Sequence, residues 1–262
     1  IVFVLKLDMG VSGVAYASLI AEWTGFLIAL WLTKEVFKNN IWKNKHHIFN
    51  ISRIKKMASI NSDILIRTLL LQAAILSFIF LGSSFNDETL AANQILIQFL
   101  HISSYGMDGF AIASEALVGK AVGARKINTF RRAVKLTSIW GAITVIGIFI
   151  FFSLFGEILI RYMTTSIDIQ NVAIKYLPWM VIAPLVGGAS WMLDGIFIGA
   201  TRTADMRNMM LISFVFYILS LIILLPNYGN HGLWLALIIF YIARGVTLGF
   251  RFNKIELSLA QS

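Results

Sequence analysis

The sequence has no cysteine and few charged residues, and each shortage excludes a class of protein. Without cysteine, the chain can form no disulfide, thiolate metal site or cysteine nucleophile. Only 13% of the residues are charged, whereas soluble domains have about 25%. That is too few to cover a water-soluble protein of 262 residues, 58% of which are hydrophobic. The surface of this protein is therefore expected to face lipid.

Long stretches with almost no charge predict the fold. About 20 mostly apolar residues in a helix cross the hydrocarbon core of a bilayer. Seven such stretches occur, and turn-forming residues at 226–232 separate the last two. The predicted spans are 11–33, 64–82, 89–112, 135–156, 176–200, 209–225 and 232–250. Because the apolar runs are continuous, barrel strands are excluded, and the prediction is an all-α integral membrane protein with seven transmembrane helices.

The net charge of +9 reflects the orientation of these helices. If the spans alternate in direction, one side of the membrane holds only Lys6, Arg161 and Lys175 outside the spans. Most of the other basic residues fall on the opposite side, in segments 34–61, 120–135, 202–207 and 251–254. By the positive-inside rule this basic side is cytoplasmic, and no nucleic-acid partner is expected.

Segment 34–61 is the one long predicted connection. Its stretch 51–60 has apolar residues every three positions between basic ones, which predicts either a short helix in the cytoplasmic interface or a solvated basic linker. His46 and His47 are adjacent and have no third ligand nearby, so no metal site is expected. Arg67 and Arg244 lie near the basic ends of their spans, where their side chains are expected to reach the interface.

Span 89–112 carries a polar stripe. Its members, at steps of three and four residues with one further member seven residues on, are Gln94, Gln98, His101, Tyr105, Asp108 and Glu115. This spacing places them on one helical face. Lipid does not tolerate such a face, so the stripe either lines a cavity or forms hydrogen bonds with other helices.

Two further acidic residues are candidates for an ion or substrate pathway. Glu22 lies near the middle of the first span, where it would exchange a proton or attract a cation. Asp194 precedes Arg202 by eight residues, so it belongs to the cytoplasmic half of its span and either serves the pathway or pairs with Arg67 or Arg244. No hydrolase, zinc-protease or phosphate-loop motif is present, which favours transport over catalysis.

The ends of the sequence suggest a repeat. Residues 10–17 and 229–236 share a G-x-x-G-φ-φ-φ-A pattern, where φ is hydrophobic, at an offset of 219. Both segments open helices that run in the same direction, as in the parallel repeats of a transporter. Since the chain also opens at Ile1 without an initiator methionine, we expect it to be a fragment of a longer protein.

Three segments resemble multidrug and toxic compound extrusion (MATE) transporters, particularly their DinF-like branch. Residues 107–125, with the pattern MDGFAIASEALVGKAVGAR, are similar to the family's eighth helix. Residues 193–208 and 232–245 are similar to its tenth and twelfth helices.

The resemblance implies a twelve-helix fold of two lobes. In it, residues 1–33 are the last helix of a truncated N-terminal lobe, 34–61 a basic cytoplasmic linker, 62–252 a complete six-helix C-terminal lobe and 253–262 a cytoplasmic tail.

The implied function is export of amphiphilic or cationic compounds in exchange for H⁺ or Na⁺, from a bacterial inner membrane. The implied partners are the bilayer, such small substrates and the missing N-terminal lobe, with no organic cofactor or bound metal. Some Na⁺-coupled relatives use an acid in the seventh helix, where this sequence has Arg67 and Gln72, which favours H⁺. The alternatives are a lipid-linked oligosaccharide flippase of the same superfamily or, if the chain is not a fragment, a seven-helix receptor or structural membrane protein.

Overall fold

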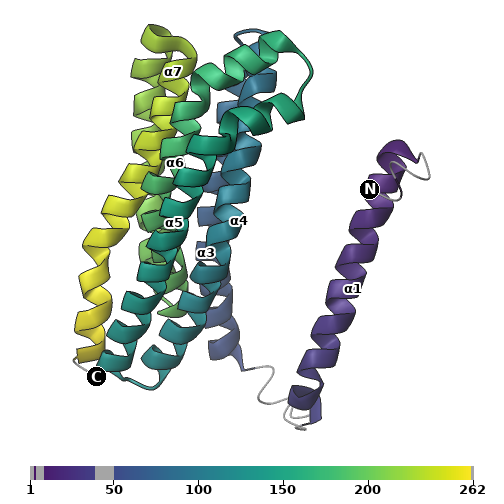
Figure 1. The fold of residues 1–262 in the computed structure, drawn as a ribbon. Helices are drawn as coiled ribbons and strands as arrows, with labels where there is room; N and C mark the ends of the chain where they lie inside the picture. The colour runs from purple at the N-terminus through teal and green to yellow at the C-terminus, as the bar shows by residue number, and fades with distance from the viewer. Residues whose placement is uncertain (1–2, 4–8, 39–49, 261–262) are drawn as a thin grey trace. The chain divides into compact units, whose positions relative to one another are not determined.

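The computed structural model describes residues 3, 9–38 and 50–260, nearly all of them in helices (Figure 1). The helices are α1 (Gly10–Lys38), α3 (Ile51–Gly82), α4 (Asp87–Gly123), α5 (Ile127–Met163), α6 (Ile167–Gly199) and α7 (Thr203–Ala260). All seven predicted spans fall on these helices, so the predicted fold class is confirmed. By contact, the chain divides into two units, Ile1–Met57 and Ala58–Ser262, which are described separately.

Five of the described helices, α1, α3, α5, α6 and α7, are long and apolar enough to cross a membrane. In α7 the segment Thr203–Leu257 is 55 residues long, which suffices for two crossings. Helix α4 is not among the five, because its polar residues interrupt the apolar sequence. In the first unit, nearly all described side chains of α1 are exposed, so this helix needs lipid or another helix to cover it.

Helix α7 folds back on itself as two antiparallel arms (Figure 1). At the bend Gly229 has φ 54° and ψ −131°, a conformation outside the helical range that glycine adopts without strain. The arms contact each other along their length, with the rings of Tyr217 and Phe240 5.5 Å apart. The predicted break between the last two spans is therefore confirmed, and the bend itself occurs at Gly229.

Short connections end α4 and α6 in the same way. Arg125 and Thr201 adopt positive φ values of 53° and 56° just after these helices. In each case the next amide bonds back to the last helical turn, from Lys126 to Ala121 O at 3.0 Å and from Arg202 to Phe197 O at 2.9 Å. Such caps satisfy the last carbonyls of a helix and let the chain reverse at once.

Helices α4 and α6 approach each other closely because glycines face the contact. A Cβ atom on Gly195 would overlap the carbonyl oxygen of Ala111, and one on Gly199 would lie 2.5 Å from the carbonyl oxygen of Glu115. Small residues four apart permit this backbone approach in membrane helices. The contact places α6 beside Glu115, the last residue of the polar stripe of α4.

The basic stretch 51–60 is helical, but it forms the first turns of α3. Of the two predicted alternatives for this stretch, the helix is confirmed, but it is not a separate one, because the apolar spacing of the stretch runs on into the span without a breaker. His46 and His47 lie outside the described residues.

Candidate functional site

The predicted polar stripe lies on the exposed side of α4. Gln94, Gln98, Tyr105 and Asp108 are exposed, and His101 and Glu115 are partly buried. Between these positions, Asn93, Met107 and Ser114 turn inward and are buried against the bundle. Helices α3 and α6 approach the stripe only at Asp108 and Glu115, and Gln94, Gln98 and Tyr105 stay exposed. Among the described residues, the stripe therefore does not serve as a hydrogen-bonded helix contact.

The stripe holds few contacts of its own. The rings of His101 and Tyr105 lie 6.4 Å apart on successive turns. Within the described part of the chain, Gln94, Gln98 and Asp108 form no hydrogen bond or ion pair with another side chain. Amide and carboxylate groups at membrane depth are costly in lipid, so this face requires water, a ligand or further protein against it.

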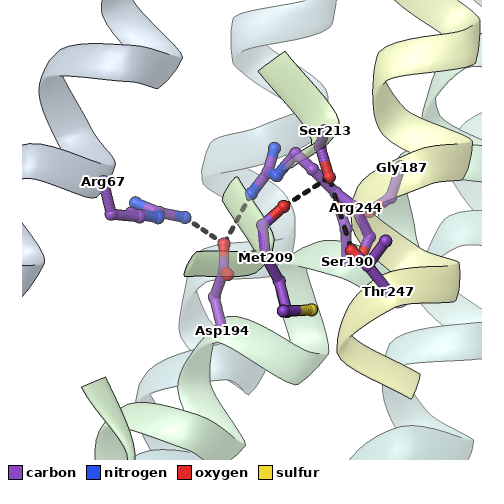
Figure 2. Close-up of polar contacts among 8 residues, drawn as sticks. All are labelled: Arg67, Gly187, Ser190, Asp194, Met209, Ser213, Arg244 and Thr247. Atoms are coloured by element: carbon purple, nitrogen blue, oxygen red, sulfur yellow. Dashed lines mark hydrogen bonds and ion pairs between the residues drawn. The ribbon is translucent and has the colours of Figure 1, made fainter. Parts of the chain in front are cut away.

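Asp194 lies on α6 between two arginines (Figure 2). Its Oδ2 atom accepts a hydrogen bond from Arg67 of α3 and another, of 2.6 Å, from Arg244 of α7. This ion triad ties three helices together. Of the two alternatives predicted for Asp194, the pairing with a basic residue is observed, and it involves both Arg67 and Arg244.

The side chain of Arg244 does not reach the interface, so that prediction is wrong. Arg244 is only 1% exposed, and its guanidinium lies 5.5 Å from the ring centre of Phe240 and 5.8 Å from that of Tyr241. The ion pair and the two aromatic faces offset its desolvation. Arg67 is also directed at Asp194, with a side chain 17% exposed.

The triad is not fully satisfied. Within the described residues, Oδ1 of Asp194, Nε of Arg67, and Nε and Nη1 of Arg244 are buried without a hydrogen-bond partner. Three hydroxyls near Arg244 do not fill this need, since Ser190, Ser213 and Thr247 bond carbonyls of their own helices (Figure 2). Buried groups of this kind require water or a ligand.

A cavity of about 310 Å³ joins the triad to the stripe. Arg67 and Asp194 line it from one side, and Asp108 and Glu115 from α4. Counting Arg244 behind Asp194, three carboxylates and two guanidinium groups surround this space. If all are ionised, the group carries one excess negative charge.

Of the eight predicted site residues, Asp108, Glu115 and Asp194 line this cavity, and the other five do not. Glu22 lies exposed on α1 and is described with the first unit alone. Gln94 lies at the far end of the stripe, next to a buried amide cluster. Among the described residues, no group of three or more His, Asp or Glu side chains is placed to hold a metal ion.

Two polar clusters were not predicted from the sequence. At the end of the bundle where α7 begins, Asp63 accepts hydrogen bonds from Thr203 at 3.0 Å and Arg207 at 2.6 Å. At the other end, Asn93 exchanges hydrogen bonds with Asn230 and accepts one from Trp234. The partners are 137 to 144 residues apart, so helix periodicity carries no signal for the pairing.

Together, these features describe an integral membrane protein whose helical bundle presents a polar face joined to a buried ion triad. The sequence profile of the MatE family matches residues 64–223, and the chain belongs to this family.

Relatives agree with this membership. DNA damage-inducible protein F of Escherichia coli (strain K12) is 35% identical over 254 residues, covering 94% of this chain and 53% of that protein. Protein DETOXIFICATION 44, chloroplastic, of Arabidopsis thaliana is 23% identical over 256 residues, covering 95% of this chain and 47% of that protein. The chain thus spans about half the length of the curated relatives it matches.

Solved structures show the same fold. A crystal structure of a mutant of the Vibrio cholerae MATE transporter VcmN matches with a TM-score of 0.81 at 19% identity, covering 100% of this chain and 59% of that one. The resemblance to DinF-like MATE proteins is confirmed. Membership of a family of membrane transporters favours transport over catalysis, and over a receptor or purely structural role.

Proposed function

We propose that the chain is the C-terminal part of a secondary active antiporter that exports amphiphilic or cationic compounds in exchange for H⁺, by alternating access between two lobes. Residues 1–33 would end the N-terminal lobe, 34–61 link the lobes, 62–252 form the second lobe and 253–262 the tail. The observation that carries the proposal is the uncovered polar face of α4, which continues into a charged cavity. The missing N-terminal lobe would form the opposite wall.

The charge around the cavity favours a cationic substrate. Among the described residues, Asp108 and Glu115 line the cavity without an ion pair to either arginine, whereas Asp194 is paired with both. One added proton or one monovalent cation would neutralise the group. Because Arg67 places a fixed positive charge at Asp194, a metal cation is repelled there, which favours H⁺ over Na⁺ as the coupling ion.

The rival function is a flippase for a lipid-linked oligosaccharide. One observation supports it, since Arg67 lines the cavity and an anionic pyrophosphate would need basic groups. However, Asp194 occupies this guanidinium, and carboxylates outnumber arginines in the cluster. The cluster therefore suits a cation better than a pyrophosphate.

An efflux assay on the full-length protein tests the proposal. Cells expressing Gln98→Ala, His101→Ala or Asp108→Ala are expected to retain several times more of the fluorescent cation ethidium than cells with the parent protein. Ser153→Ala, on an exposed part of α5 away from the stripe, is the matched control and should export normally. Unchanged ethidium accumulation in all three stripe variants would contradict the proposal.

Reconstitution separates the coupling ions. Proteoliposomes with an imposed pH gradient should drive ethidium movement, whereas a Na⁺ gradient at equal pH on both sides should not. Transport driven by the Na⁺ gradient alone would reverse the assignment of the coupling ion. We also place the protein in a bacterial inner membrane with its basic end in the cytoplasm, as the distribution of basic residues favours.

A further inference from the structure

A long groove runs along α5, away from the polar stripe. At the basic end of the bundle, a cavity of about 430 Å³ lies between α5 and the last turns of α7, lined by Lys135, Ile139 and Phe252 among others. A second cavity, of about 380 Å³, lies between α5 and α6, with Met107 of α4 also lining it. Ser138 and Ala142 line both cavities, so the two adjoin along α5 and are treated together as one groove.

The groove is long enough to cross half of the hydrocarbon core of a membrane. It extends along α5 from Arg131 to Ile146, which is about 22 Å at the helical rise. Half of the hydrocarbon core is about 15 Å thick. The groove therefore reaches from the level of the lipid headgroups towards the middle of the bilayer.

The two ends of the groove differ in chemistry. At the mouth, Nε of Arg131 pairs with Glu256 at 3.0 Å. Lys135 lies exposed one turn further on and has no ion pair with any described residue. The mouth thus keeps one uncompensated positive charge.

Deeper in, the lining is mostly apolar, and small residues form part of it. Gly141, Ala142 and Gly188 lie along this part of the groove. A Cβ atom on Gly141 would lie 2.9 Å from Sδ of Met192, and one on Gly188 would lie 2.5 Å from Cγ2 of Val145. The glycines thus keep the helices close while leaving a shallow apolar channel at the surface.

We propose that this groove binds an anionic phospholipid, with its phosphate at Arg131 and Lys135 and one acyl chain along Ala142. A cationic substrate would be repelled by the mouth, and a zwitterionic lipid would gain less from the uncompensated charge, because its own ammonium group lies beside its phosphate. Basic pockets at the cytoplasmic ends of transmembrane helices bind anionic headgroups in this way. The assignment of the site to the cytoplasmic leaflet rests on the orientation proposed above, while the site itself does not depend on transport.

Native mass spectrometry of the full-length protein in detergent tests the proposal. The protein is titrated with phosphatidylglycerol and, separately, with phosphatidylcholine of the same acyl chains. Tighter binding of phosphatidylglycerol is expected. Lys135→Gln should weaken that binding about fivefold, the effect of one basic residue near a headgroup. The matched control is Arg132→Gln, an equally exposed neighbour that lines neither cavity, and it should change binding less than twofold.

A second variant tests the channel rather than the charge. Ala142→Phe would fill the place where the cavities meet and should weaken binding of both lipids. Ile143→Phe, on the adjacent exposed position outside the groove, should leave both unchanged.

Three results would overturn the site: equal binding of the two lipids, equal losses in Lys135→Gln and Arg132→Gln, or no loss in Ala142→Phe. Bound lipid is counted without any transport step. Failure of the antiporter proposal would therefore leave this result standing, and failure here would leave the antiporter proposal intact.

Discussion

Asn93 and Gln94 are consecutive residues of α4, yet their side chains lie in opposite surroundings. Asn93 is 1% exposed and bonds with Asn230 and Trp234 across the bundle. Gln94 is exposed and begins the polar stripe. The same contrast separates Asp194, held by two arginines, from Asp108, which faces the cavity from the stripe.

The difference separates two uses of polar side chains at membrane depth. Where a polar group is packed between helices, its partners are fixed by the fold, and its removal leaves those partners unsatisfied. Where a polar group lies on the exposed face of α4, its removal leaves no hydrogen-bond partner unsatisfied in the bundle. Buried polar groups should thus control stability, and exposed ones should control transport.

The largest effect is expected from Asp194→Ala. Removing this carboxylate leaves Arg244 fully buried without its counter-charge, which should lower the free energy of unfolding by about 3–5 kcal/mol. Denaturation of the full-length protein in detergent measures this loss. Asp108→Ala is the matched carboxylate on the exposed face and should cost less than about 1 kcal/mol. If the two variants unfold alike, the triad does not hold α3, α6 and α7 together.

A smaller loss is expected from Asn93→Ala. The substitution removes the acceptor of Trp234 and breaks the amide pair with Asn230, which should cost about 1–2 kcal/mol. The same denaturation experiment measures it, with Gln94→Ala as the neighbouring control. A greater loss in Gln94→Ala than in Asn93→Ala would show that the stripe is also packed in the complete protein.

The smallest effect on stability is expected from Gln98→Ala. Gln98 bonds with no described residue, so the free energy of unfolding should change by less than about 0.5 kcal/mol. Ethidium transport should nevertheless fall when the same purified, folded variant is reconstituted in proteoliposomes. A variant that loses stability and efflux together would assign Gln98 to packing and remove it from the pathway.

Much of the architecture was predictable from the sequence. Each apolar stretch became a helix, and the turn residues at 226–232 marked the bend of α7, because long apolar runs and breakers are local signals. The extent of α3 is not predicted by the sequence, because the basic residues at 51–60 are equally compatible with a separate short helix or a linker and with the first turns of the span.

The candidate site was predicted only in part. Spacing alone put Gln98, His101 and Asp108 on one face of a helix, and that face is the uncovered one. The burial of Arg244 could not be predicted, because the sequence position of a basic residue near a helix end is equally compatible with the interface and with a buried ion pair. The pairing of Asp63 with Arg207 was missed for the same reason.

The sequence by itself determined that this is a helical membrane protein with its basic residues concentrated in the connections, because composition and periodicity act along the chain. Only the tertiary structure decided which polar residues are partners, since Arg67, Asp194 and Arg244 come from three helices that meet through packing. It also decided where the surface is hollow. The cavity beside Asp108 and the groove along α5 depend on how closely α4, α5 and α6 approach, which glycine contacts across helices control.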